Sequence, residues 1–332
     1  MTEILEGPEA IVAAVARLGL GEPIAFPTET VYGLGADALD HDAVARIFAL
    51  KGRPSNNPLI VHVSGSTMAQ DLVDQWTPDA QKLAEEFWPG ALTLVLKKSE
   101  SVPDIVTAGG PTVAVRCPGH PIALALIESL GKPLVGPSAN PSGWISPTTS
   151  AHVAEGFDGH DLLILEGGSC RAGIESTVLD LTSDQPAVLR LGIVSASKIS
   201  RCLGVTVTAN DPRSQPDHKI PPTSPGLLGA HYQPKTPTSL RDPNELSDAH
   251  DGVYLIGISD QSSDFPGIFR LMPRDPVGYA HELYAAMHEG DASSASEIWI
   301  ERVPEMDDAD ADRQSDAPLW AAVMERLRRA CR

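Results

Sequence analysis

Helix-forming and strand-forming patterns alternate along the first two hundred residues, and this alternation constrains the fold more than any other feature of the chain. Apolar residues recur at helical spacing over residues 8–18, 42–50, 79–88 and 121–130. Short apolar runs typical of buried strands cover residues 23–26, 58–63, 91–96, 112–116, 134–136, 162–165, 178–181 and 188–191. Helices that alternate with strands pack in layers on a sheet. The sequence therefore predicts an α/β fold.

Proline breaks this pattern near residue 204. Seven prolines fall within residues 208–237, where both helix and central strand are disfavoured. Beyond them, strand patterns at 252–257 and 297–300 and helical patterns at 278–288 and 319–330 indicate a second, smaller α/β domain. We expect a first domain over 1–207, a linker over 208–237 and a second domain over 238–332. The acidic run at 301–317 is expected to be a solvated or disordered loop.

Composition excludes several classes of protein. Hydrophobic residues make up 42% of the 332, enough for a real core, and the net charge of −19 disfavours non-specific nucleic-acid binding. The four cysteines are far apart and form no CxxC pair, so a reducing cytoplasm fits better than a disulfide framework. We see no signal-peptide pattern and no apolar stretch long enough to span a membrane.

Polar segments that directly follow predicted strands are the candidate binding loops. In the first, Phe26 to Gly35, we expect a strand to end at Pro27 and a glycine-punctuated turn to follow. The hydroxyls of Thr28 and Thr30 suit an amino acid or a phosphate, although a capped turn explains them equally well. Segments 136–143 and 173–177 have the same character, with hydroxyl and amide groups beside glycine.

Three cations stand out in this acidic chain. Lys51 and Arg53 lie between a predicted helix and a buried strand, and Arg116 ends an apolar strand. Charges at such places suit an anion site, although cations at a helix end also have a purely structural explanation. Because each lies at the edge of an apolar element, we expect that removing Lys51 or Arg116 lowers activity and leaves stability almost unchanged.

Familiar catalytic motifs are missing. The chain has no GxxxxGK[ST] loop, no GxGxxG, no HExxH and no GxSxG, and its ten histidines form no metal-ligand spacing. A bound nucleotide would need a less common arrangement.

Taken together, six segments resemble the threonylcarbamoyl-AMP synthase, or YrdC-like, family. They are PTETVYGLGADA, KGRP-x3-PLIVHV, WPGALTLVL, TVAVRCPGHP, GPSANPSG, and IESTVLDL followed by VLRLG. They occur in the family's order over residues 8–203. The later segments SPGLLGAHYQPKTP and APLWAAVMERLRRA resemble the long form of the family. The resemblance implies a twisted mixed sheet followed by a smaller Rossmann-like domain.

The resemblance also implies an activity: synthesis of threonylcarbamoyl-AMP and pyrophosphate from L-threonine, bicarbonate and ATP, for threonylcarbamoyladenosine in tRNA. Mg²⁺ would arrive with ATP, and no protein-held metal is implied. The product would pass to proteins that complete the transfer to tRNA. Two alternatives stay open: a carbamoyl-adenylate transferase with another acceptor, and a non-catalytic RNA-binding module. The cysteine spacing argues against the first alternative and the charge against the second.

Site residues follow from the same motifs. The resemblance implies that threonine would be bound by Thr28, His62, Arg116 and Ser176. The ATP-binding set is Lys51, Arg53, Ser55, Thr112, Ser138, Asn140, Ser146, Arg190 and Tyr232, and Lys51, Arg53 and Arg116 are the catalytic cations. Structural explanations compete for two of them, since alternation could turn His62 to solvent and Ser146 could simply begin a turn. Gly229 stands where long-form members place a lid tyrosine, for which His231 or Tyr232 could substitute.

Overall fold

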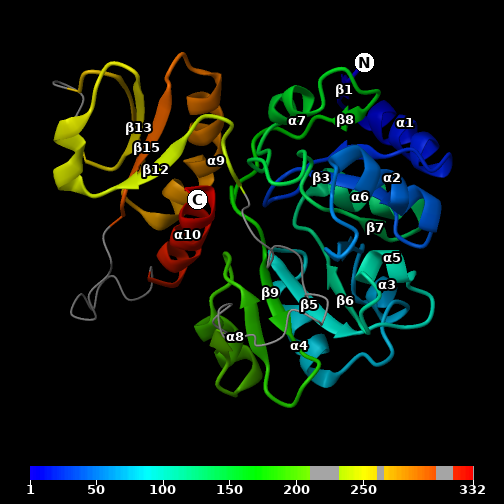
Figure 1. The fold of residues 1–332 in the computed structure, drawn as a ribbon. Coiled ribbons are helices and arrows are strands. Elements are labelled where there is room, and N and C mark those ends of the chain that lie inside the picture. The colour runs from blue at the N-terminus through cyan, green and yellow to red at the C-terminus, as the bar shows by residue number, and fades with distance from the viewer. Residues whose placement is uncertain (210–231, 260–264, 304–316, 332) are drawn as a thin grey trace. The chain divides into compact units, whose positions relative to one another are not determined.

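The computed structural model describes residues 1–209, 232–259, 265–303 and 317–331. The chain divides into two compact units (Figure 1). The first comprises residues 1–142, 147–171 and 175–209, and the second comprises 143–146, 172–174 and the described residues from Tyr232 onwards. Most of the expected linker and of the acidic run, together with Gly229 and His231, lie outside the described residues.

A mixed sheet forms the centre of the first unit. Its strands, in spatial order, are β1 (Glu3–Leu5), β8 (Leu163–Leu165), β2 (Ile24–Phe26), β3 (Gly33–Asp37), β7 (Leu134–Val135), β4 (Ile60–His62), β6 (Thr112–Arg116), β5 (Leu92–Lys97), β9 (Thr177–Asp180), β10 (Ala187–Arg190) and β11 (Thr208–Ala209). Parallel and antiparallel pairs both occur, for example β4 with β6 and β5 with β6. The expected mixed sheet is confirmed.

Helices connect these strands, and the predicted ones form with ends close to those expected. They are α1 (Pro8–Gly19), α2 (His41–Lys51), α3 (Ser66–Gln70), α4 (Pro78–Phe87), α5 (Asp104–Thr107), α6 (Pro121–Leu130), α7 (Ser150–Gly156) and α8 (Ala196–Leu203). The α2 helix shows why the ends are predictable. The Asp40 carboxylate accepts the backbone N–H groups of Asp42 and Ala43, and Gly52 ends the helix in the left-handed conformation.

The two faces of the sheet differ over β4, β6, β5, β9 and β10. Alternate residues such as Val113 and Val115 pack into the main core of the unit with residues of its helices. Their neighbours on the opposite face form a small separate apolar cluster of Ile60, Val95, Ala114, Val178 and Leu189. Because side chains alternate along a strand, Thr112 and Arg116 lie on the same face as Ala114. This second face is the platform on which several predicted site residues stand.

Gly33 and Gly35 have a different role from the one the sequence suggested. We expected a turn throughout this segment, but both glycines lie in β3, which pairs antiparallel with β2. A Cβ at Gly33 would lie 2.9 Å from the Phe26 ring, and one at Gly35 would lie 3.0 Å from it. The glycines therefore let Phe26 lie flat across the neighbouring strand. The turn itself is limited to residues 27–32.

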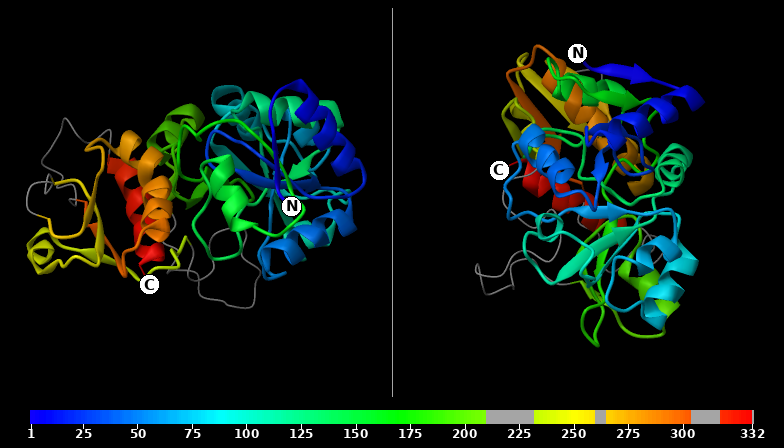
Figure 2. Two further views of the ribbon diagram at one scale, coloured as in Figure 1. Left: turned by 90° about the horizontal axis from the view of Figure 1, so that it is seen from above. Right: turned by 90° about the vertical axis from the view of Figure 1, so that its right-hand side faces the viewer.

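The second unit contains a parallel sheet, as expected for a Rossmann-like domain. Its strands, in spatial order, are β12 (Thr238–Arg241), β15 (Glu297–Glu301), β13 (Val253–Gly257) and β14 (Ile268–Leu271). Its helices are η2 (Pro243–Asp248), α9 (Pro276–Ala292) and α10 (Ala317–Ala330). Figure 2 shows α9 and α10 side by side. Buried Glu301 ends β15 and accepts the backbone N–H groups of Ile258 and Ser259.

None of the helices in the described ranges is both long and apolar enough to cross a membrane.

Candidate functional site

A row of polar side chains crosses the platform face of the first unit. The register places His62 of β4 beside Arg116 of β6. The β5 strand runs antiparallel to β6, with Leu94 opposite Val115. Thr93, one residue earlier in β5, therefore lies opposite Arg116 and continues the row. Thr93 lies opposite Val178 of β9, which in turn lies opposite Arg190 of β10. Residues from four distant parts of the sequence thus meet along one line of the sheet.

Arg116 is buried, with 3% of its surface exposed. Its Nε donates to the carbonyl of Gly90 at 3.1 Å, and its Nη1 donates to the Thr30 hydroxyl at 3.0 Å. Its Nη2 lies 2.6 Å from the Glu29 carboxylate. This last contact is an ion pair without the alignment of a hydrogen bond, because neither Nη2 nor Glu29 Oε1 has a hydrogen-bond partner among the described residues. The arginine is therefore held in place and its charge is compensated.

The loop that carries Glu29 is fixed by its own hydroxyl groups. The Oγ1 of Thr28 accepts the backbone N–H groups of Thr30 and Val31 and donates to the Val31 carbonyl at 2.6 Å. The same Oγ1 lies 2.8 Å from Thr30 Oγ1. Such a turn explains why threonines are needed here even in the absence of a ligand. It also presents the Thr30 hydroxyl to the Arg116 guanidinium.

His62 is not turned to solvent, since only 2% of its surface is exposed. Its ring stands edge-on to Phe26 at 5.7 Å between centroids, and a Cβ at Gly136 would come within 2.5 Å of Nδ1. That nitrogen is buried and has no hydrogen bond of normal geometry within the described chain. Burial first, and then the Arg116 charge, lower the pKa of His62 well below its usual range, and the Ile60 carbonyl opposes this only in part. A neutral imidazole whose Nδ1 makes no hydrogen bond of normal geometry within the described chain therefore lies buried beside Arg116.

The low pKa of His62 predicts a dependence of stability on pH. The unfolded chain binds a proton at this histidine below about pH 6.5, whereas the folded chain does not until its lower pKa is reached. The free energy of unfolding should thus fall with acid by up to about 1.4 kcal/mol per pH unit in that window. Denaturant unfolding from pH 7.5 to 5 would measure it, with His62→Gln as the comparison. Identical pH dependences in the two proteins would contradict this.

Lys51 and Arg53 hold loops of the first unit together. The Nζ of Lys51 donates to the backbone carbonyls of Ser138 and Asn140, with only 3% of the residue exposed. Burial, and then the charge of Arg53, lower the Lys51 pKa well below its usual range. Arg53 donates to the carbonyls of Asn57 and Pro58, at 3.1 and 2.9 Å, which closes its own loop. An anion bound beside Lys51 and Arg53 would compensate their positive charges and favour the protonated form of the lysine.

Both buried cations overturn one expectation. We expected Lys51 and Arg116 to lie at edges where their removal would leave stability almost unchanged. Instead each is buried and donates to backbone carbonyl oxygens, that of buried Asn140 and those of half-buried Ser138 and Gly90. Removing either one leaves buried polar groups without partners, and such groups are costly. The expected placement at an edge was wrong, because the sequence shows where a strand or helix ends but not what covers that end. The effect of removing either residue stays a prediction.

Ser176 and Arg190 form a second buried group in this face. The Ser176 hydroxyl lies 2.8 Å from Thr93 Oγ1 and accepts Arg190 Nη2 at 3.1 Å. The Nε of Arg190 donates to the Ser176 carbonyl at 3.0 Å. The β5–β9 and β9–β10 pairings bring these three residues together. They link the Arg116 region to the far side of the sheet.

Four predicted residues lie apart from these groups. Thr112 shares the face of Arg116 but lies four residues away on the same strand, or about 13 Å. Ser55 is exposed on the loop that Arg53 closes. Ser146 and Tyr232 belong to the second unit, where the Ser146 carbonyl lies 3.3 Å from His288 Nε2 and the Tyr232 ring stacks on Tyr284 at 5.5 Å. Their predicted contacts with ATP stay predictions.

Sequence reasoning missed two residues of the site. Glu29 lies within the PTETVYG segment. Arg116 ends an apolar strand, and a cation in apolar surroundings needs a counter-ion, which in the structure is Glu29. Thr93 is the lone polar residue inside the apolar run ALTLVL, and its side chain is completely buried. A single hydroxyl in an otherwise apolar strand is a signal that needs a partner.

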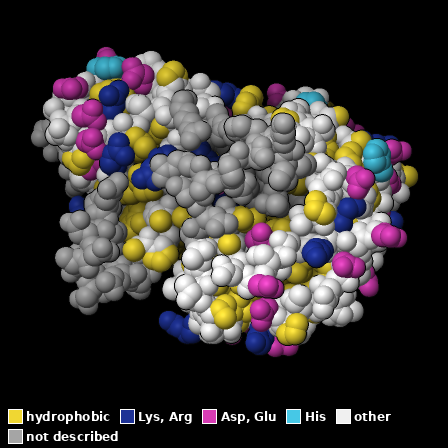
Figure 3. Space-filling model, turned by 60° about the horizontal axis from the view of Figure 1, so that its bottom comes forward, with side chains coloured by type: hydrophobic (Ala, Val, Ile, Leu, Met, Phe, Trp, Pro, Cys, Tyr) yellow, Lys and Arg dark blue, Asp and Glu magenta, His cyan; other side chains and the backbone are white. Residues whose placement is uncertain are grey.

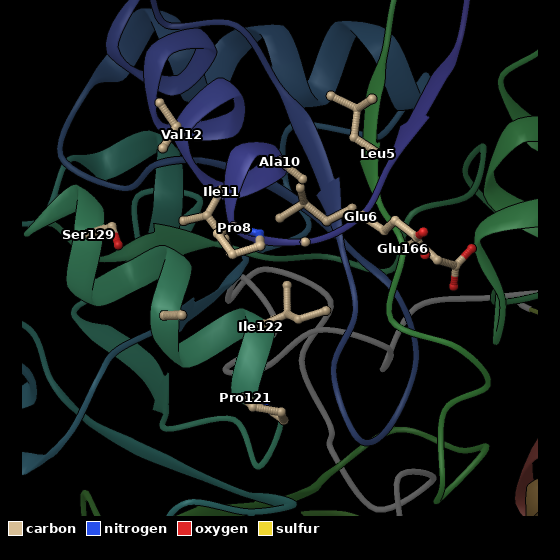
Figure 4. A pocket seen from close by; sticks show the side chains of 13 residues that line it. Leu5, Glu6, Pro8, Ala10, Ile11, Val12, Pro121, Ile122, Ser129 and Glu166 are labelled. Carbon is tan, nitrogen blue, oxygen red and sulfur yellow. The ribbon is translucent and has the colours of Figure 1, made fainter.

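A cavity of about 480 Å³ lies elsewhere in this unit (Figure 4). Ile11 and Pro8 of α1 and Ile122 of α6 line it, with Glu166 at one side. None of the predicted site residues lines it. Because its walls are mostly apolar and bring no cation or donor cluster together, we do not assign the chemistry to it.

A cluster of metal ligands or a continuous basic surface would indicate two other kinds of binding site. No group of three or more His, Cys, Asp or Glu residues there is placed to hold a metal ion. Over the right-hand part of Figure 3, single Lys and Arg side chains are interspersed with Asp and Glu. A surface of this kind gives no continuous path for a phosphate backbone.

Comparison with known proteins gives consistent matches over nearly the whole chain. Residues 17–192 match the Sua5/YciO/YrdC family, described as telomere recombination, and residues 194–331 match the threonylcarbamoyl-AMP synthase C-terminal domain. The threonylcarbamoyl-AMP synthase of Pyrococcus abyssi is 40% identical over 93% of this chain and 90% of its own. That of Bacillus subtilis is 44% identical over 72% and 68%. The crystal structure of P. abyssi Sua5 complexed with L-threonine is 36% identical and covers 100% of this chain and 97% of its own, with a TM-score of 0.86.

Proposed function

The chain belongs to the threonylcarbamoyl-AMP synthase family, and we propose that it makes threonylcarbamoyl-AMP and pyrophosphate from L-threonine, bicarbonate and ATP. The observation that carries the proposal is the buried Arg116, held beside the Thr28 turn and His62 on one face of the sheet. A fixed cation suits the carboxylate of an amino acid, and the hydroxyl and imidazole groups around it suit the amino group and a side-chain hydroxyl.

The reaction joins anions, and this determines what the protein must supply. The threonine ammonium first gives up one proton, to water or to bicarbonate, and the resulting amine combines with bicarbonate to a carbamate with loss of water. A carbamate oxygen then attacks the α-phosphate of ATP, and pyrophosphate leaves. Fixed cations reduce the repulsion between carbamate and phosphate, and positioning supplies much of the remaining rate. Arg116 is fixed by three groups, so its charge does not need to be reorganised during the reaction.

Roles for the other residues follow from their contacts. Burial, and then the charge of nearby Arg53, lower the pKa of Lys51, so these two neighbouring basic groups form a region suited to an anion such as phosphate. Lys51 also holds the loop that carries Ser138 and Asn140. Ser176 and Arg190 form the far end of the row. His62 can accept a hydrogen bond from the threonine ammonium or hydroxyl, because one nitrogen of a neutral imidazole is an acceptor.

Magnesium would reach the site with ATP. Among the described residues, the carboxylate that Arg116 contacts is that of Glu29, and the guanidinium already compensates its charge. The residues described around it therefore fit an ion held mainly by phosphate oxygens, which is usual for Mg²⁺. When bound, such an ion would offset the charge of the triphosphate.

The four cysteines are free thiols, which suits a reducing compartment, and we propose the cytoplasm. We propose that the product passes to proteins that transfer its threonylcarbamoyl group to adenosine in tRNA.

Pyrophosphate release is the direct test of the proposed function. We expect release from ATP only when L-threonine and bicarbonate are both present, with an AMP conjugate of matching mass as co-product. Omission of either substrate, with bicarbonate-depleted buffer as the control, should reduce release to background. Equal release without threonine would contradict the proposal, and conjugates formed equally well with unrelated amino acids would indicate a different acceptor.

A further inference from the structure

Glu29 is a buried carboxylate that the proposed chemistry does not yet use. Its side chain is 10% exposed, and that of Arg116, 2.6 Å away, is 4% exposed. Its second oxygen accepts the backbone N–H of Gly119 at 2.9 Å. The negative charge is therefore fixed at one side of the guanidinium, and the Thr30 hydroxyl is fixed at another.

Stability alone does not explain this pair. Removing two charges from water is expensive, and a buried ion pair is often no more stable than apolar residues of the same size. An anion site is also better served by an arginine without a carboxylate beside it, since Glu29 repels any anion that approaches Arg116. The placement of Glu29 thus works against a ligand that carries only negative charge.

Both partners keep unused hydrogen-bonding capacity. A carboxylate has about four acceptor positions, and within the described chain Glu29 uses two, one toward Arg116 and one toward Gly119. A guanidinium has five N–H groups, and Arg116 directs three of them to Gly90, Thr30 and Glu29. A ligand that brings an anion and a cation a few bonds apart could satisfy both at once.

We infer that Glu29 binds the ammonium group of L-threonine while Arg116 binds its carboxylate. The ion pair is then a template for the zwitterion, and it selects α-amino acids over the corresponding 2-hydroxy acids. It also holds the nitrogen that is to become the carbamate. This inference rests on the proposed function, because it takes L-threonine as the substrate.

The test compares two ligands in two proteins. The full-length chain and its Glu29→Gln variant are titrated by calorimetry with L-threonine and with (2S,3R)-2,3-dihydroxybutanoate, in which a hydroxyl replaces the ammonium. We expect the unsubstituted protein to prefer L-threonine by on the order of 10–100-fold, as for a charge-assisted hydrogen bond. Glu29→Gln should reduce that preference to less than about fivefold, because L-threonine loses its partner for the ammonium and the hydroxy acid no longer meets the repelling carboxylate, so its affinity should rise and not fall. Glu86→Gln, an exposed site on α4, serves as the matched control and should behave like the unsubstituted protein.

The contrary results are distinct. If Glu29→Gln weakens both ligands by the same factor, the carboxylate only positions Arg116, and the inference is overturned. An unchanged preference overturns it as well. If Glu29→Gln does not fold, Glu29→Asp is the second variant, because it keeps the negative charge. A folded Glu29→Asp protein should retain at least a tenfold preference for L-threonine over the hydroxy acid. Loss of that preference would refute the inference. Absence of L-threonine binding to the unsubstituted protein would instead refute the proposed function.

Discussion

Lys51→Met should lower kcat/KM for pyrophosphate release by on the order of 10²–10³-fold and should also destabilise the protein. The substitution keeps most of the side-chain volume but removes the ammonium that donates to the Ser138 and Asn140 carbonyls. Leaving buried acceptors without a donor costs about 1–3 kcal/mol each. The freed loop would then no longer hold Ser138 and Asn140 for the nucleotide. Steady-state kinetics and denaturant unfolding measure the two effects separately.

An exposed lysine provides the matched control for this experiment. Lys82 on α4 is more than half exposed and pairs with Asp79 at 3.7 Å. Lys82→Met should change kcat/KM less than twofold and the free energy of unfolding by less than about 0.5 kcal/mol. A Lys51→Met protein with normal stability would show that the loop does not depend on this ammonium. Normal kinetics would remove Lys51 from the site altogether.

Arg116→Met should have the largest effect on stability of any single change in the site. It leaves the Glu29 carboxylate buried without its cation, and breaking a buried ion pair in this way costs about 3–5 kcal/mol. Loss of the only guanidinium that the β6 strand supplies should also abolish measurable threonine-dependent pyrophosphate release. Chemical unfolding and the pyrophosphate assay would report both. Arg201→Met, at an exposed position in the last turn of α8, is the control.

A second substitution separates the structural part of this effect from the catalytic part. Adding Glu29→Gln to Arg116→Met removes the unpaired charge, so the double variant should recover at least about 1 kcal/mol of stability. Its activity should not recover, because the cation that binds the anionic substrate is still missing. Additive stability effects would mean that the two side chains do not interact in the folded protein.

The helices and strands of the first unit could be read from the sequence because each has a local cause. Asp40 and Gly52 mark the ends of α2, and apolar runs such as TVAVR mark buried strands. Short or edge elements were missed where that signal was weak. The β3 strand was hidden by glycines whose real role is to make room for Phe26, and β12 and β14 in the second unit are not strongly apolar. A local pattern cannot show a packing requirement from another strand.

The sequence by itself determined the α/β class, the order of the motifs and the residue types of the site, since these depend on local periodicity and on which side chains follow each strand. Only the tertiary structure decided which residues meet. The sheet order β4–β6–β5 places His62, Arg116 and Thr93 in one row, and the β5–β9 pairing brings Ser176 against Thr93, although more than one hundred residues separate His62 from Ser176. The tertiary structure also decided that Arg116 is buried against Glu29. The environment of a charge depends on long-range packing and on the exclusion of solvent, and the neighbouring residues in the sequence do not determine either of them.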